Sequence, residues 1–168
     1  MENETAPSKW EGKHVAGVNG VTAEKIWTAV SDFCNVDKWF PRLDTCRRVE
    51  GSDGQVGLIR YCASTETKSD GSGAAAVTKW AKERLVKFDP IGRCISYEIL
   101  ENNVGFGSYA ATVKVNPTDG GDEGVGCEIE WSFVADPVEG WKKEDLDSYV
   151  EFSLKHMTKK MEDYFLSA

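Results

Sequence analysis

The chain has 168 residues and a formal net charge of −8, with 40% hydrophobic and 11% aromatic residues. This length predicts one domain, and the apolar content predicts a buried core rather than a disordered chain. The negative charge argues against nucleic acid or an anionic membrane surface as a partner. No apolar run approaches the roughly 18 residues of a membrane span, so no integral membrane association is expected.

The N-terminus and the cysteines indicate the cellular compartment of the protein. Residues 1–8 are polar and acidic, which predicts a flexible segment rather than a secretory signal, followed by a single domain over residues 9–168. The five cysteines are an odd number without a closely spaced pair, which is typical of reduced thiols in a cytoplasmic protein. With two histidines and no cysteine cluster, we predict no metal site, and no cofactor is expected.

The first fifty residues predict a strand, two short helices and a second strand. The strand covers residues 9–18, and Thr22 then suits a helix N-cap because an acidic residue follows in the first turn. A second helical piece over residues 36–40 ends at Pro41. The apolar face of the first helix is formed by Ile26, Trp27, Val30 and Phe33.

Strands and turns alternate through the middle of the chain. The six strands predicted after the short helices cover residues 43–50, 58–64, 75–88, 94–100, 109–115 and 127–133. Glycine-rich or polar segments at residues 51–54, 68–73 and 118–124 predict the turns between them. Because Gly51, Gly54 and Gly57 lie between strands and do not lead into a helix, they do not form a dinucleotide-binding loop.

A long helix is predicted at the C-terminus, after the breaks at Pro137 and Gly140. Acidic residues in its first turn are stabilised by the positive end of the helix dipole. One apolar stripe runs along about six turns, roughly 30 Å. It consists of Leu146, Val150, Leu154, Met157, Met161 and Phe165. The stripe is either ordinary core or, as its flexible methionines favour, partly a cavity wall. We predict that residues 149–167 are helical with this stripe facing a sheet.

The order of these elements predicts an α+β fold. Short loops between consecutive strands imply antiparallel neighbours rather than a doubly wound parallel sheet. A sheet of seven strands twists and must curl around another element. The long helix is the element able to fill the concave side.

Several polar side chains share the apolar side of their strands. Glu83 alternates in step with Ala81 and Leu85, and the same reasoning turns Tyr97, Tyr109 and Trp131 inward. A buried carboxylate needs a partner, and Arg60 on the neighbouring strand is the candidate. Two interpretations stay open: a structural cross-strand ion pair, or a polar corner of a cavity in which Glu83 acts as acid or base and Tyr109 contacts the substrate.

Four segments resemble the plant lachrymatory-factor-synthase-like proteins of the START-like superfamily, which includes the birch pollen allergen, polyketide cyclases and abscisic acid receptors. They are Gly57-Leu58-Ile59-Arg60-Tyr61, Trp80-Ala81-Lys82-Glu83-Arg84-Leu85, Ser108-Tyr109-Ala110-Ala111-Thr112 and Glu130-Trp131-Ser132-Phe133. The resemblance runs from about Trp10 to the C-terminus, and Trp80-Ala81-Lys82-Glu83 is its most specific part. The chain departs from the onion enzyme at residues 65–78 and 102–108.

The resemblance implies a helix-grip fold, in which a seven-stranded antiparallel sheet wraps around the C-terminal helix with an internal hydrophobic cavity. It implies a cofactor-free isomerase or cyclase, whose relative in onion rearranges a small alkenyl sulfenic acid, with Arg60, Glu83 and Tyr109 as catalytic residues. The alternative is a non-catalytic carrier or receptor for a small hydrophobic molecule; a homodimer is left open. The residues predicted to line the pocket are Tyr97, Trp131, Phe133, Leu58, Leu154 and Met157.

Overall fold

The structure is a computed structural model that describes residues 8–66, 77–118 and 126–167. Its helices are α1 (Ala23–Val30), the 3-10 helix η1 (Phe33–Lys38) and α2 (Lys143–Leu166). Its strands are β1 (Trp10–Asn19), β2 (Thr45–Glu50), β3 (Ile59–Glu66), β4 (Val77–Asp89), β5 (Cys94–Asn102), β6 (Tyr109–Pro117) and β7 (Gly126–Ala135). Residues 1–7 of the N-terminal segment predicted to be flexible, the predicted turn at 68–73 and residues 119–124 of the predicted loop at 118–124 lie outside the described residues.

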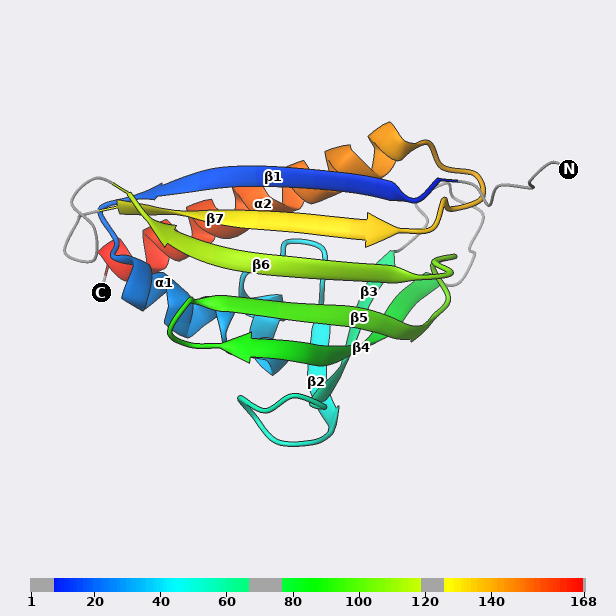
Figure 1. The fold of residues 1–168 in the computed structure, drawn as a ribbon, viewed down its shortest axis with the longest axis horizontal. Coiled ribbons are helices and arrows are strands. Elements are labelled where there is room, and N and C mark those ends of the chain that lie inside the picture. The colour runs from blue at the N-terminus through cyan, green and yellow to red at the C-terminus, as the bar shows by residue number, and fades with distance from the viewer. Residues whose placement is uncertain (1–7, 67–76, 119–125, 168) are drawn as a thin grey trace, which may run out of the picture.

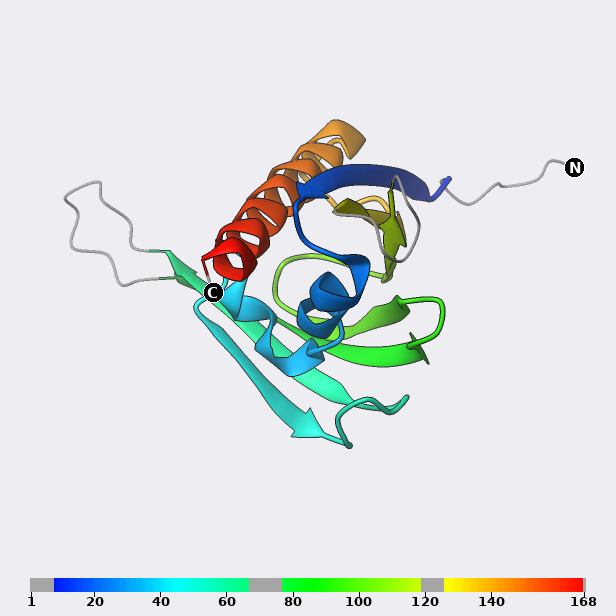
Figure 2. The same cartoon turned by 90° about the vertical axis from the view of Figure 1, so that its left-hand side faces the viewer.

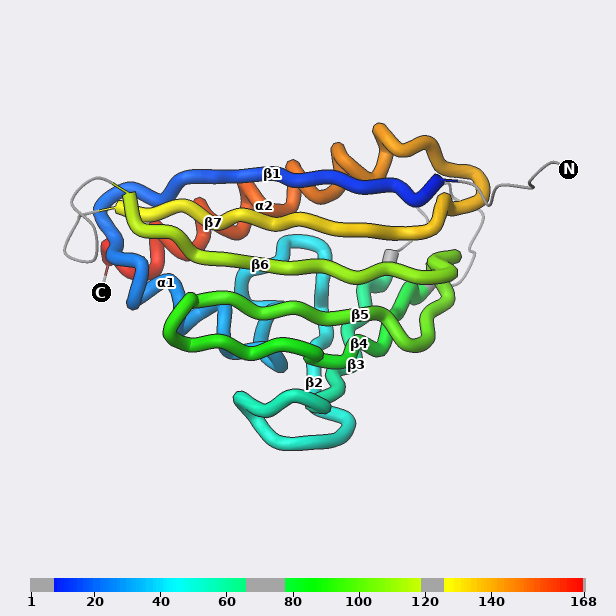
Figure 3. The backbone as a smooth tube through the Cα atoms, viewed as in Figure 1, coloured from blue at the N-terminus to red at the C-terminus, as the bar shows by residue number. Residues whose placement is uncertain are grey.

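All seven strands form one antiparallel sheet in the order β1-β7-β6-β5-β4-β3-β2 (Figure 1). From β2 to β7 each strand pairs with the next one along the chain, as Figure 3 lets the reader follow. The first strand, β1, forms the other edge of the sheet and pairs with β7, from Trp10 opposite Ala135 to Asn19 opposite Gly126. The predicted seven-stranded antiparallel α+β fold is therefore confirmed.

The sheet curls around α2, with α1 and η1 also on its concave side (Figure 2). Five members of the apolar stripe, from Leu146 to Met161, are buried, and Phe165 is half-buried. At the start of α1 the Thr22 hydroxyl accepts a hydrogen bond from the Lys25 amide at 3.3 Å, as its N-cap position predicts. The long helix thus fills the concave side of the sheet, and the prediction for its stripe is confirmed.

The first turns of α2 lie very close to β1. At Gly12 a Cβ atom would come within 2.6 Å of the Phe133 ring and closer still to the Asp147 carboxylate, so the lack of a side chain permits this approach. Two residues further along β1, the His14 ring lies 2.9 Å from Asp147, between His14 Nε2 and Asp147 Oδ1. Lys143, one turn earlier on α2, binds the other oxygen of the same carboxylate. These contacts fix the N-terminal end of α2 against the edge of the sheet.

Acid should weaken this attachment. Burial raises the pKa of Asp147, but the hydrogen bonds from Lys143 and His14 outweigh it and bring the pKa below the usual 3.8. A carboxyl whose folded pKa is depressed stabilises the fold above its unfolded pKa, and this stabilisation is lost as the pH falls further through the folded pKa. We expect Asp147→Asn to lose less of its melting temperature than the wild type between pH 6 and pH 3. Thermal melts at pH 6 and pH 3 measure this loss for each protein. An equal loss of melting temperature in the two proteins would contradict this role of Asp147.

Some element boundaries differ from the predicted ones. Phe33, assigned to the first helix, instead begins η1, because Asp32 has non-helical backbone angles (φ −82°, ψ 72°) that separate the two helices. Leu58 precedes β3 rather than beginning it. The strand predicted to end at residue 100 continues to Asn102, which is still paired with Ala81. These shifts move no predicted strand out of the sheet.

Candidate functional site

A cavity of about 540 Å³ lies between the sheet and the helices. Residues of α1, β3–β7 and α2 line it, together with η1 and the segment that follows η1. The wall is largely apolar and aromatic, and its size falls within the range of small-molecule pockets. Four exposed residues, Pro41, Arg42, Thr65 and Lys79, also line the cavity, so it reaches the surface on their side.

Arg60 and Glu83 form an ion pair in the cavity wall. They are direct partners across β3 and β4, and both line the cavity. Arg60 Nε and Nη2 lie 2.7 and 2.6 Å from the same carboxylate oxygen, Oε1 of Glu83. Only 7% of the Arg60 side chain and 13% of the Glu83 side chain are exposed. Glu83 therefore faces inward and is paired with Arg60, as the alternation along its strand led us to expect.

The 3-10 helix η1 contacts the guanidinium from a second direction, through Phe33. Nη1 of Arg60 donates to the backbone carbonyl of Phe33 at 2.8 Å. The guanidinium carbon lies 3.8 Å from the centre of the Phe33 ring and 4.7 Å from that of Tyr97, so the cation packs against two aromatic rings. Burial opposes the charge of Arg60, but the Glu83 carboxylate and the other acidic groups nearby together outweigh burial and raise the arginine pKa. Arg60 is therefore a fixed, permanently charged group.

The pair leaves hydrogen-bonding capacity for a ligand. A guanidinium has five N–H donors, and the contacts above use one on each of its three nitrogens. Oε2 of Glu83 has no hydrogen-bond partner among the described residues. Because both side chains line the cavity, the wall can offer a ligand N–H donors next to a carboxylate oxygen.

Two phenols stand beside the ion pair. Trp131 Nε1 donates to the Tyr109 hydroxyl at 3.2 Å, and the rings of Tyr97 and Tyr109 lie 6.4 Å apart. Burial, opposed by the bond from Trp131, raises the pKa of Tyr109; burial also raises the pKa of Tyr97 well above 10. Both phenols therefore stay protonated at neutral pH and can serve as donors, not as bases.

Removing the Tyr109 hydroxyl should destabilise the fold. In Tyr109→Phe the buried indole N–H of Trp131 loses its acceptor, which costs about 1–3 kcal/mol of the free energy of unfolding. Urea denaturation measures this loss. Tyr164→Phe is the matched control, because the Tyr164 side chain is exposed and should change stability little. An unchanged unfolding free energy in Tyr109→Phe would show that the indole N–H finds another acceptor.

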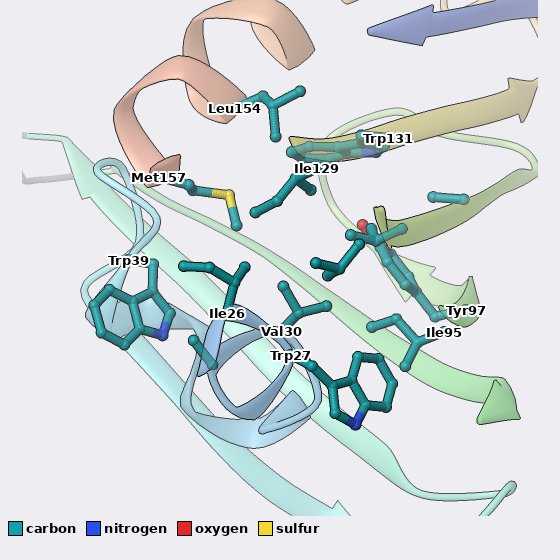
Figure 4. Close-up of a cluster of buried hydrophobic side chains, with 14 of the residues drawn as sticks. Ile26, Trp27, Val30, Trp39, Ile95, Tyr97, Ile129, Trp131, Leu154 and Met157 are labelled. Carbon is teal, nitrogen blue, oxygen red and sulfur yellow. The ribbon is translucent and has the colours of Figure 1, made fainter. Parts of the chain in front are cut away.

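The residues predicted to line the pocket divide into two groups. Tyr97, Trp131 and Met157 line the cavity. Leu58, Phe133 and Leu154 do not belong to its described lining, and their assignment to the wall is corrected: all three are buried in the packed core at 1% exposure. Figure 4 shows the reason for Leu154, whose side chain reaches from α2 toward Trp131 and Ile129 of β7. Some inward-facing side chains thus line the cavity, and others are packed in the core.

The sequence did not single out two further residues of the site. Phe33 holds Arg60 through a backbone carbonyl and a ring face, and a carbonyl carries no signal in the sequence. Tyr149 lines the cavity from α2, and burial, reinforced by the charge of Glu83 and opposed by that of Arg42, raises its pKa to about 12. Its position next to Val150 at the edge of the apolar stripe could have indicated it.

The described part of the chain shows neither a metal-binding cluster nor a membrane span. Its His, Cys, Asp and Glu side chains form no group of three or more that could hold a metal ion. No helix among its residues is long and apolar enough to cross a membrane.

The curled sheet, the long helix and the cavity between them define a birch-pollen-allergen-like helix-grip domain. The chain belongs to the family described as polyketide cyclase / dehydrase and lipid transport, whose sequence pattern matches residues 13–163.

Solved structures share this fold at low sequence identity. The protein XoxI from Bacillus cereus is 21% identical, with a TM-score of 0.69 over 93% of this chain and 95% of that one. A protein from Thermobifida fusca is 22% identical, with a TM-score of 0.65 over 86% and 84% of the two chains. Ara h 8.0201 is 18% identical, with a TM-score of 0.67 over 94% and 99%. At these identities the likeness is one of fold.

Proposed function

We propose that the protein binds a small, largely apolar molecule bearing an oxygen-containing group and moves a proton on it without a cofactor. The reaction class is that of an isomerase or cyclase, similar to lachrymatory factor synthase. The observation that carries this proposal is the Arg60–Glu83 pair, beside Tyr109, in the wall of an otherwise apolar cavity. Membership of a family described as polyketide cyclase / dehydrase supports it.

The geometry suggests a role for each group. The remaining N–H donors of Arg60 would bind and polarise the ligand oxygen. Glu83, through its unpartnered Oε2, would take a proton from the ligand and return it at another position, so the enzyme ends in its starting state. Tyr109, whose oxygen already accepts from Trp131, would donate its own proton to a second ligand atom as a hydrogen bond. Trp131 and Tyr97 would keep water away from the reacting group.

A non-catalytic carrier or receptor is the second candidate. Arg60 and Glu83 bind each other, and Phe33 holds Arg60 as well, as in an ion pair that only supports the wall. The rest of the lining offers mainly apolar burial, and the family description includes lipid transport. In this case the pair would add stability and polarity to the cavity but no chemistry.

Incubation with a metabolite extract from the source organism distinguishes the two candidates. Chromatography with mass detection follows which molecules the protein retains and which it converts, against a heat-denatured control. The proposal predicts that one small apolar molecule disappears and a product accumulates far above the protein concentration. A molecule that is retained unchanged, in an amount no greater than the protein, would identify a carrier.

Several narrower expectations stay predictions. They are the lachrymatory-factor type of substrate, the cytoplasmic location, the homodimer and the absence of a nucleic-acid partner. The acidic net charge still argues against nucleic acid.

A further inference from the structure

Two cysteines face each other across the β2–β3 edge of the sheet. Cys46 and Cys62 are direct partners in the antiparallel register, and their sulfur atoms lie 3.4 Å apart. Cys62 is buried and lines the cavity, whereas Cys46 is only half-buried. Figure 2 shows β2 and β3 lying along each other at one end of the curled sheet. The ligand chemistry proposed above uses neither thiol.

The geometry of this pair suits a disulfide. Directly opposed residues of an antiparallel pair have Cα atoms about 4.5–5.5 Å apart, which is within the range that disulfides span. The sulfurs need to approach by about 1.4 Å to reach the bond length of about 2.05 Å. Rotation of the two side chains supplies such a movement, so the strands can keep their register.

The two thiols differ in reactivity. The hydrogen bond from the Cys62 thiol lowers the pKa of Cys46; burial opposes this, and the nearby charge of Arg60 adds to it. The same hydrogen bond, together with burial, raises the pKa of Cys62. Burial raises the pKa of Cys34 to about 11, so Cys34 is less prepared to react. Because the thiolate is the nucleophile, Cys46 is the attacking residue and Cys62 the one that completes the bond.

We propose that Cys46 and Cys62 are a hydroperoxide-reactive dithiol that closes to an intramolecular disulfide. The Cys46 thiolate attacks one peroxide oxygen: an S–O bond forms, the O–O bond breaks, and the leaving oxygen takes up a proton as an alcohol or water. The Cys62 sulfur then attacks the sulfenic acid of Cys46, the S–S bond forms, and the hydroxyl leaves with the Cys62 proton as water. The two sulfurs together lose the two electrons that the peroxide gains.

Oxidation of this pair also changes the cavity wall. The Cys46 thiol lies 3.9 Å from the Phe33 carbonyl oxygen, the same atom that accepts from Arg60. In the disulfide this thiol donor is gone, and the Cys62 sulfur has turned toward β2. The dithiol therefore acts as a redox-responsive part of the wall that holds the Arg60–Glu83 pair.

Mass spectrometry after treatment with hydrogen peroxide tests the chemistry. We expect the wild type to lose the mass of two hydrogen atoms, with peptide mapping after alkylation placing the bond between Cys46 and Cys62. Cys127→Ser, the control in β7, should behave the same, and Cys46→Ser should form no such bond. Cys62→Ser should stop at a sulfenic acid on Cys46 that dimedone captures. Five free thiols after treatment of the wild type, a bond between other cysteines, or the same mass loss in Cys46→Ser would overturn the proposal.

The coupling to the cavity is tested with anilinonaphthalene sulfonate as an apolar fluorescent probe. Its dissociation constant should differ at least twofold between the reduced and the oxidised wild type, and should not change on peroxide treatment of Cys46→Ser. If the disulfide forms and the affinity stays the same, the dithiol reacts with peroxide but does not act on the cavity, and the regulatory part of the proposal is wrong.

Discussion

Glu83→Gln should lower both the stability and the turnover of the protein. The neutral amide would leave the Arg60 guanidinium buried without a counter-charge, which costs about 3–5 kcal/mol of the free energy of unfolding. If Glu83 also transfers the proton, turnover per folded molecule falls by about 10²–10⁴. Binding of the ligand should be retained, because Gln has the shape of Glu and the apolar wall is unchanged. Urea denaturation and turnover are measured on the same preparation.

Two control variants separate structure from chemistry. In Arg60→Met combined with Glu83→Leu, no buried charge is left, so stability should return to within about 1 kcal/mol of the wild type or exceed it, while turnover stays lost. Glu98→Gln breaks the exposed Arg84–Glu98 pair on β4 and β5 and should cost less than about 1 kcal/mol, with no effect on turnover. A Glu83→Gln protein that melts earlier but keeps full turnover would make the pair purely structural.

Leu154→Ala should be among the most destabilising core substitutions. Leu154 is 1% exposed and packs on the sheet without lining the cavity, so its truncation leaves a new void in the core. Such a change costs about 2–5 kcal/mol. Met157, one turn further along α2, lines the cavity, and Met157→Ala would enlarge a space that is already there. We therefore expect its cost near the lower end, about 2 kcal/mol.

In ligand binding, the order of the two effects should be reversed, with the larger effect in Met157→Ala. Met157→Ala should change the affinity for anilinonaphthalene sulfonate, because the wall of the cavity moves, and Leu154→Ala should leave it nearly unchanged. Urea denaturation and a fluorescence titration of each variant provide the comparison. A shift in probe affinity in Leu154→Ala alone would place Leu154 in the wall after all and Met157 in the core.

Periodicity predicts the fold and the inward face well but does not locate the cavity. The stripe from Leu146 to Met161 and the inward position of Glu83 follow from spacings of 3.6 and 2, which the structure retains. The same rule could not separate Met157 from Leu154. Whether an inward side chain borders empty space or packed neighbours depends on where α1 and η1 lie, and no local spacing encodes that.

The pairing of Arg60 shows a second limit. Buried and partly buried side chains lie on both faces of β3, with Arg60 and Cys62 on one and Ala63 on the other, so alternation alone does not orient the strand. The charge of Glu83 on the neighbouring strand is what identified Arg60 as its partner. The Phe33 carbonyl and the close approach of Cys46 to Cys62 depend on register and on the path of η1, which emerge only in three dimensions.

The most direct test of the proposed proton-transfer site compares the molecules bound to the wild type and to Glu83→Gln after both have been mixed with the same metabolite extract. Chromatography of the released ligands, with mass detection, identifies them. We expect Glu83→Gln to hold one small apolar molecule that the wild type has converted to a product of different retention time. If both proteins release the same unchanged molecule in equal amounts, the cavity is a binding site only, and the catalytic roles of Arg60, Glu83 and Tyr109 are wrong.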